Sequence, residues 1–229
     1  MGRLKMFCAL PRKKEVSSQW FHDHWRHPHG TLGMKISTVR NYVQSHQIDT
    51  ALLGSDQRRY EGVVEVWFDS ETDAAALPDH PTYRRYLVPD EPTFIDMDEI
   101  RFLFTHEEIL VSGPDPGDAK GDGDLAWREA DRATSIKLIQ FVETGGMSAW
   151  ADDLDIELGR RIGALRHALC RPSNILHPDG GAFIGVRELW WPTLTAFEVG
   201  VEADPGAFQE LTARPASAVS LLVHAERFI

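Results

Sequence analysis

Short apolar stretches recur along the chain between more polar segments, and their spacing predicts the secondary structure. Alternating, β-branched and aromatic stretches predict strands, whereas apolar residues repeating every three or four positions predict helices. In the first half this gives the order strand, helix, strand, strand, helix, strand. The predicted elements span Leu4–Leu10, Ser17 to about Ile36, Val39–His46, Gly62–Phe68, about Thr72–Tyr86 and Ile100–Leu110. We expect Pro78 and Pro81 to divide the second helix into short turns.

The second half is expected to repeat this order. Leu4–Leu10 resembles Ile136–Val142 at an offset of 132 residues, and Phe104–Glu108 resembles Leu222–Glu226. The segment Ala182–Pro192, which ends in two tryptophans and a proline, stands outside the repeated order. The predicted elements are a strand over Ile136–Val142, a helix from about Trp150 to Leu165, strands near Ala168–Ile175 and Thr195–Glu202, a helix near Pro205–Ala213 and a strand over Ala218–Phe228.

This repeated order predicts the fold class. A strand–helix–strand–strand–helix–strand unit is ferredoxin-like, with both helices on one face of its sheet. We therefore predict an α+β protein with two ferredoxin-like repeats, over residues 1–111 and 134–229. Residues 112–133, rich in Gly, Pro and Asp, are interpreted as a linker. The uncovered sheet faces would close into a barrel, either within one chain or between two chains.

Composition and charge exclude several classes of protein. The 229 residues include 24 basic and 35 acidic side chains, a net charge of −11, which disfavours nucleic acid and anionic membranes as partners. No apolar stretch is long enough to span a bilayer, and the first residues do not resemble a signal peptide. Cys8 and Cys170 are interpreted as reduced, buried thiols, so we expect a cytoplasmic protein.

Histidines concentrate in one short segment, which is the clearest sign of chemistry in the chain. Four of the ten histidines lie within Phe21–Gly30. Imidazole titrates near neutral pH, so it suits proton transfer and metal binding. If this segment is helical, with Ser17 near its start, His22, Trp25 and His29 share one face. A face that mixes imidazoles with an indole indicates a pocket wall.

The same segment resembles the EthD-domain family, whose members form dimeric α/β barrels. The resemblance covers about residues 1–110 and implies that architecture for this chain. Related members look like cofactor-free decarboxylases or dehydratases of polyketide and aromatic metabolism. The matching residues are Phe21, Trp25 and His29 in the family's aromatic–Trp–His pattern, the strand Tyr60–Asp69 and the run Asp90–Asp96. The second half has no His/Trp stripe, so we expect one pocket in each chain.

His29 is the predicted proton-transfer residue, and His22 is expected to assist it. Because side chains alternate along a strand, Glu65 and Trp67 share one face of their strand, and Tyr42, Gln44 and His46 share one face of theirs. If these faces line the pocket, Glu65 is the acidic partner of His29. The predicted substrate-binding residues are Trp25, Tyr42, Trp67, His46, His80 and Tyr83. The alternatives are a solvated His22, a Glu65 at a solvent edge, and a His29 bonded to backbone carbonyls at a helix end.

Metals and cofactors are not expected. His22–His27 resembles the His-x-His-x-Asp-His motif of the metallo-β-lactamase fold, but Arg26 stands where Asp is required. Nucleotide-binding glycine loops, Gly-x-Ser-x-Gly and Cys-x-x-Cys are all missing from the sequence. Haem, which some tandem α/β-barrel families bind, would require His167 or His177 as its ligand, and we do not expect it.

Two functional hypotheses follow. In the first, the protein is a cofactor-independent lyase, a decarboxylase or dehydratase, or an isomerase that acts on a small aromatic or polyketide-like metabolite through His29. In the second, it is a non-catalytic binding or accessory protein for a hydrophobic metabolite or a monooxygenase system. A small-molecule substrate and a second copy of the chain, in a homodimer, are the expected partners.

Overall fold

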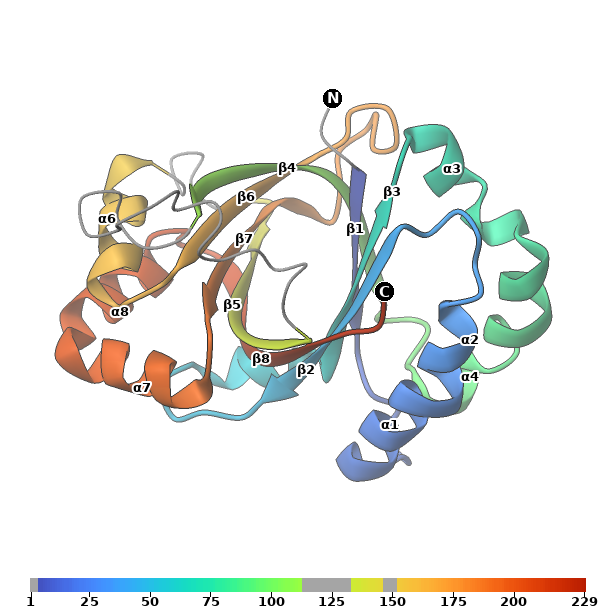
Figure 1. The fold of residues 1–229 in the computed structure, drawn as a ribbon, viewed down its shortest axis with the longest axis horizontal. Coiled ribbons are helices and arrows are strands. Elements are labelled where there is room, and N and C mark those ends of the chain that lie inside the picture. The colour runs from blue at the N-terminus through green and yellow to red at the C-terminus, as the bar shows by residue number, and fades with distance from the viewer. Residues whose placement is uncertain (1–3, 113–132, 146–151) are drawn as a thin grey trace.

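The computed structural model describes residues 4–112, 133–145 and 152–229, in which eight antiparallel strands close into one barrel (Figure 1). The order around the barrel is β1-β3-β2-β8-β5-β7-β6-β4, so each half of the chain supplies four neighbouring strands and the barrel closes within one chain. The strands are β1 (Leu4–Leu10), β2 (Asn41–Ile48), β3 (Gly62–Phe68), β4 (Arg101–Ser112), β5 (Thr134–Glu143), β6 (Arg166–Pro172), β7 (Phe183–Trp191) and β8 (Ala218–Arg227). Most of the predicted linker, residues 113–132, lies outside the described residues.

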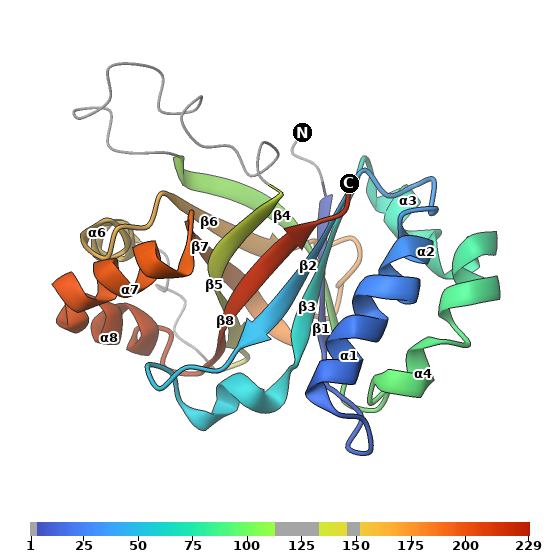
Figure 2. The ribbon, with the colours of Figure 1, turned by 60° about the horizontal axis from the view of Figure 1, so that its bottom comes forward.

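Two groups of helices cover opposite sides of the barrel (Figures 1 and 2). The barrel wall therefore has two faces. The outer face packs against the helices, and the inner face lines the barrel interior. None of the described helices is both long enough and apolar enough to span a bilayer. The helices are α1 (Ser18–His24), α2 (Thr31–Gly33), α3 (Glu71–Ala75) and α4 (Glu91–Phe94) in the first half, and α6 (Asp153–Arg161), α7 (Leu194–Ala203) and α8 (Pro205–Ala213) in the second.

Two predictions for the second half are wrong. The predicted strand Thr195–Glu202 is helix α7, whose buried residues Phe197 and Val201 are one helical turn apart. The segment Ala182–Pro192, left outside the repeated order, contains strand β7. Most residues of β7 are buried on both faces of the barrel wall, so its sequence lacks the alternation that reveals a half-buried strand.

The long helix predicted from Ser17 to about Ile36 is also interrupted. Helix α1, capped by the Ser17 side chain, ends at His24, and at His27 the backbone is extended, with φ −151° and ψ 126°. Pro28 explains the break, because its ring disfavours helical geometry at the preceding residue and it has no N–H to donate. Pro78 and Pro81 divide the second helical region into short turns, as expected.

The register between β2 and β3 decides which side chains face the helices. Tyr42 is opposite Val66, and Val43 is opposite Glu65. Because side chains alternate along a strand, Tyr42 and Val66 point toward the helices, and Val43 and Glu65 point into the barrel. The apolar part of the barrel interior consists of residues such as Phe7, Val63, Leu103, Ile139, Phe141 and Leu221.

We predict that Gly62→Ala lowers the free energy of unfolding by about 1–3 kcal/mol, the usual cost of overpacking. A Cβ at Gly62 would lie 2.4 Å from Cζ3 of the buried Trp25 indole, which packs directly on the strand. Urea unfolding measures the effect. Gly54→Ala is the matched control, because a Cβ there would meet no atom within 4 Å. Equal stability of the two variants would contradict the close packing of Trp25 on β3.

Candidate functional site

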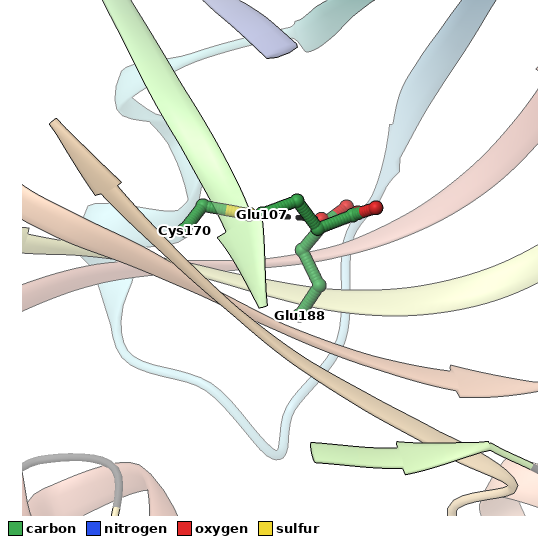
Figure 3. Close-up of side chains that lie close together, drawn as sticks. All are labelled: Glu107, Cys170 and Glu188. Carbon is green, nitrogen blue, oxygen red and sulfur yellow. Dashed lines mark hydrogen bonds between the residues drawn. The ribbon is translucent and has the colours of Figure 1, made fainter. Parts of the chain in front are cut away.

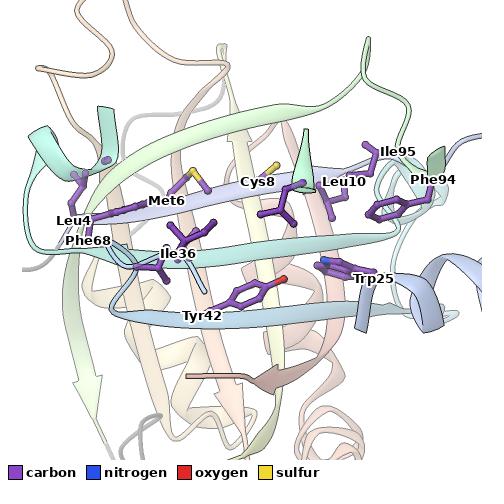
Figure 4. Close-up of a cluster of buried hydrophobic side chains, with 14 of the residues drawn as sticks. Leu4, Met6, Cys8, Leu10, Trp25, Ile36, Tyr42, Phe68, Phe94 and Ile95 are labelled. Carbon is purple, nitrogen blue, oxygen red and sulfur yellow. The ribbon is translucent and has the colours of Figure 1, made fainter. Parts of the chain in front are cut away.

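A mainly apolar cavity lies between the outer face of the first-half sheet and the helices that cover it. It holds about 610 Å³ of space free of atoms, part of which is open to solvent. Met6, Cys8 and Leu10 of β1 and Tyr42 of β2 form part of its wall (Figure 4). His29, Tyr83 and Glu91 supply most of the remaining polar groups, and no Lys or Arg is among the described residues that line it.

His29 lies buried in the wall of this cavity, where Asp90 holds its ring. Nδ1 of His29 donates to one carboxylate oxygen of Asp90 at 2.8 Å, and Nε2 of His24 bonds the other at 2.9 Å. Burial would raise the pKa of Asp90, but the hydrogen bonds from the two histidines outweigh it and lower that pKa. With its proton on Nδ1, His29 has Nε2 available to accept a proton.

A second acidic side chain, Glu91, follows Asp90 in sequence and lines the cavity. The Tyr83 hydroxyl donates to Oε2 of Glu91 at 3.2 Å. Burial raises the pKa of Glu91 above its usual value, in spite of the opposing effects of Tyr83 and His29. Burial and the adjacent carboxyl group also raise the pKa of Tyr83, so its hydroxyl stays protonated.

Tyr42 adds a neutral hydroxyl to the cavity wall. The Gln44 amide donates to the Tyr42 oxygen at 2.6 Å and to the backbone carbonyl of Trp25 at 2.8 Å. Burial raises the pKa of Tyr42, which keeps it un-ionised. The structure thus brings three of the predicted residues, His29, Tyr42 and Tyr83, to one cavity.

His22, Trp25 and His46 form a separate group. Nδ1 of His22 lies 2.7 Å from Nδ1 of His46, and the rings of Trp25 and His46 are 4.5 Å apart at their centroids. The break at His27 turns His29 away from this group, so the expected pairing of His22 with His29 on one helix face is wrong. Burial lowers the pKa of His46 to about 2, so this imidazole stays neutral.

His80 also lies outside the described cavity lining. Its Nδ1 accepts from the backbone N–H of Thr82 at 3.2 Å, so Nε2 carries the ring proton and donates to the Ser37 hydroxyl oxygen at 3.1 Å. These bonds tie the segment after α2 to the turns after α3. In this structure His80 therefore supports the covering helices and does not reach the cavity.

Glu65 and Trp67 face the barrel interior, so the expectation that they lie opposite His29 is wrong. Alternation correctly placed them on one face of β3, but that face is the opposite side of the sheet from Tyr42. Glu65 is fully buried and lies 2.8 Å from Nζ of Lys137 and 2.8 Å from Nζ of Lys5. It therefore cannot act as the acidic partner of His29.

Glu65 belongs to a lattice of four buried charges, Lys5, Glu65, Lys137 and Glu188. Lys5 also lies 2.5 Å from Glu188, and Lys137 lies 3.5 Å from it, so each lysine contacts a glutamate from each half of the chain. Lys137 and Lys5 outweigh burial at Glu65 and lower its pKa, whereas burial dominates at Glu188 and raises its pKa. The lattice joins the two halves inside the barrel.

Next to this lattice, Glu107, Cys170 and Glu188 bring three possible metal-ligand atoms within 4.8 Å of one another (Figure 3). The ammonium group of Lys5 already lies 2.5 Å from Glu188 and 3.5 Å from Glu107. Burial and Glu188 raise the pKa of the Cys170 thiol, which disfavours the thiolate that a metal requires. A lysine thus supplies the positive charge here, and the three residues do not fit a metal ion.

In the second half, side chains fill the corresponding space under the helices. Trp191, Phe197 and Phe208 pack there among other apolar residues. His167 lies at the position of β6 that corresponds to Tyr42 of β2. His167 is opposite Leu189 of β7, and Tyr42 is opposite Val66 of β3. Neither ring nitrogen of His167 has a hydrogen-bond partner among the described residues, and burial lowers its pKa to about 3.

This packing leaves no room at His167 for a haem. His177, the other histidine considered as a haem ligand, uses Nε2 to accept from the backbone N–H of Phe104 at 2.8 Å. That nitrogen is therefore already occupied within the protein. The described residues of the second half therefore do not fit a haem.

The functional residues that sequence reasoning missed are Asp90 and Glu91. Both lie within the run Asp90–Asp96, which the sequence singled out as a family landmark but not as part of the site. Asp90 is 61 residues from His29, and only the fold brings the two together. The one available signal was that this acidic pair lies inside the family landmark.

Comparisons with known proteins agree with this architecture. Residues 13–98 match the EthD domain, and no curated protein sequence matches the chain. An anthrone oxidase-like protein is similar in structure, with 13% identity, 99% of this chain and 94% of that chain covered, and a TM-score of 0.58. A candidate monooxygenase from Fusobacterium nucleatum subsp. nucleatum has 6% identity, coverage of 99% and 95%, and a TM-score of 0.54. At these identities the likeness shows the barrel fold alone.

We predict that Lys137→Met lowers the free energy of unfolding by about 3–5 kcal/mol, because it leaves buried carboxylates undercompensated. Lys14→Met, at an exposed position, is the control and should change stability by less than about 0.5 kcal/mol. Chemical unfolding of both variants measures the difference. Adding Glu65→Gln to Lys137→Met should cost less than the sum of the single changes. A Lys137→Met variant as stable as the control would contradict the lattice.

Acid should destabilise the protein partly through His167. Its folded pKa of about 3 lies below its unfolded value, so the unfolded chain binds more protons as pH falls below about 6.5. Between pH 6.5 and 5 this costs about 2 kcal/mol. His167→Leu should remove this part of the pH dependence in urea unfolding, whereas His106→Leu, at an exposed position, should keep it. Identical slopes for the two variants would refute the assignment.

Proposed function

We propose that this chain, whose residues 13–98 carry an EthD domain, is a cofactor-independent enzyme that transfers protons on a small apolar substrate. The observation that carries the proposal is the position of His29, buried in the wall of an apolar cavity with Nδ1 held by Asp90. The reaction is that of a lyase, a decarboxylase or dehydratase, or of an isomerase.

His29 acts as the general base, and its neighbours determine its state. Asp90 fixes the Nδ1–H tautomer and stabilises the imidazolium that forms when Nε2 takes a proton. His24, bonded to the other oxygen of Asp90, holds that carboxylate in place. A positioned base of this kind typically contributes about 10²–10⁴-fold to a rate.

The cavity wall supports a small aromatic or polyketide-like substrate. Its apolar side chains favour a hydrophobic molecule, and the neutral hydroxyls of Tyr42 and Tyr83 can orient one polar group of that molecule. The alternative function is non-catalytic, in which the same cavity holds a hydrophobic metabolite for a monooxygenase system.

We also infer that the two halves are duplicated ferredoxin-like repeats, over residues 1–111 and 134–229. The strand orders β4-β1-β3-β2 and β8-β5-β7-β6 support this inference. So do the matching places of Lys5 and Lys137, and of Glu65 and Glu188, in the lattice. The first repeat carries the site, and the second closes the barrel. A cytoplasmic homodimer remains part of the proposal.

Hydrogen–deuterium exchange at an activated methylene tests the function without knowledge of the natural substrate. In D₂O, wild-type protein should accelerate exchange at the methylene groups of anthrone and 2-tetralone, followed by NMR. His29→Ala should lower the catalysed rate by about 10²-fold or more, because the base is lost. His27→Ala, which removes an exposed histidine of the same segment, is the matched control and should retain the rate.

The outcome separates the two functions. A folded His29→Ala variant that still binds 2-naphthol but has lost exchange supports an enzyme. If wild-type protein binds 2-naphthol without accelerating exchange, the enzyme is ruled out in favour of the binding protein. If His29→Ala does not fold, as judged by circular dichroism, His29 is structural and the proposed role is wrong.

A further inference from the structure

Two ionisable side chains of complementary chemistry, His29 and Glu91, line the same cavity. We propose that Glu91 is the proton donor of this cavity, and that the substrate is an uncharged ketone with a removable proton on the carbon next to its carbonyl group. This inference rests on the proposed function of His29. It names the second catalytic residue and the substrate class, and within the proposed reactions it favours an isomerase over a decarboxylase.

Asp90 and Glu91 are adjacent in sequence but have different surroundings. The Asp90 carboxylate is bonded by two imidazoles, which stabilise its ionised form. Glu91 receives a hydrogen bond from the un-ionised Tyr83 hydroxyl and lines the apolar cavity. Burial also raises the pKa of Glu91, which shifts this carboxyl group toward its protonated form. The two carboxyl groups therefore differ in which protonation state their surroundings favour. Such a difference allows one carboxylate to orient a base and the other carboxyl group to donate a proton.

The charge of the cavity wall selects the substrate. The described residues that line it include no Lys or Arg. The proposed role of His29 as a base requires its uncharged form, because only that form can accept a proton. A substrate carboxylate would therefore lose its hydration without gaining a cationic partner. A ketone avoids this cost, and its oxygen can accept a hydrogen bond from protonated Glu91.

The proton transfers balance within this pair. Nε2 of His29 takes a proton from the carbon next to the carbonyl group, and the C–H electron pair becomes a C=C bond. The carbonyl oxygen takes the proton of Glu91, which gives an enol, an imidazolium and a carboxylate. Where the ketone has a C=C bond between the second and third carbons from its carbonyl group, the enol is a conjugated dienol. The imidazolium then protonates the far carbon of this dienol as the C=C bond moves next to the carbonyl group, and the enol returns its proton to Glu91. The products are an isomeric ketone and the unchanged enzyme.

Two ligands that share a ring system test the substrate class. At neutral pH 2-naphthol is uncharged, whereas 2-naphthoate carries a carboxylate on the same rings. Isothermal titration calorimetry should give at least about tenfold tighter binding of 2-naphthol to wild-type protein, a difference of about 1.4 kcal/mol. Glu91→Gln should keep this preference, because the amide is uncharged like the protonated carboxyl group it replaces. Equal affinities for the two ligands in wild-type protein would overturn the proposed substrate class.

Exchange of 2-tetralone in D₂O tests the role of Glu91. Glu91→Gln should lower the catalysed rate by about 10²-fold while 2-naphthol still binds, because the amide keeps the shape but donates no transferable proton. The wild-type rate should also fall at high pH as Glu91 ionises, and this limb should be missing in Glu91→Gln. Glu99→Gln, at an exposed position of the following segment, is the control and should behave as wild type.

Tyr83→Phe provides a second variant that keeps the carboxyl group, and it should shift the high-pH limb of the exchange rate, because it removes the hydrogen bond that Glu91 accepts. If Glu91→Gln exchanges 2-tetralone as fast as wild type while His29→Ala does not, the role of Glu91 is overturned and the proposed function stands. If wild-type protein neither exchanges 2-tetralone nor binds 2-naphthol, both proposals fall. Two results together would overturn the role of Glu91 and make it a structural residue. These are loss of 2-naphthol binding in Glu91→Gln and an unshifted high-pH limb of the exchange rate in Tyr83→Phe.

Discussion

The rest of the structure depends on the lattice of four buried charges inside the barrel. Each lysine of the lattice contacts a glutamate from both halves of the chain, so the charges are compensated only when the two halves meet in register. Removing four charges from water is costly unless each finds its partners. The inner faces of these strands therefore contact one another inside the barrel, and their outer faces pack against the helices.

The two outer faces have different fates. Under the first-half helices a cavity remains, with His29 in its wall and Asp90 behind that imidazole. Under the second-half helices large aromatic side chains fill the space, and His167 lies buried among them. One half of the chain therefore carries the candidate chemistry, while the other completes the barrel and fixes the first half from inside.

Local backbone breaks decide what reaches the cavity. Pro28 interrupts the first helix, so His22 packs against His46 while His29 turns to Asp90. Without that break His22, Trp25 and His29 would share one helix face. The start of the short helix α4 then supplies two adjacent carboxyl groups: Asp90, directly before the helix, bonds the imidazole, and Glu91, its first residue, lines the cavity.

The sequence by itself determined most strands, the breaks at Pro78 and Pro81 and the resemblance that points to His29. Alternation also showed which residues share a face of one strand, such as Glu65 with Trp67. It could not show which face meets the helices, because that depends on pairing between distant strands: Glu65 meets Lys137, 72 residues away. β7 escaped recognition because burial on both faces removes alternation. Only the tertiary structure could join His29 to Asp90, since contacts between distant residues leave no local pattern.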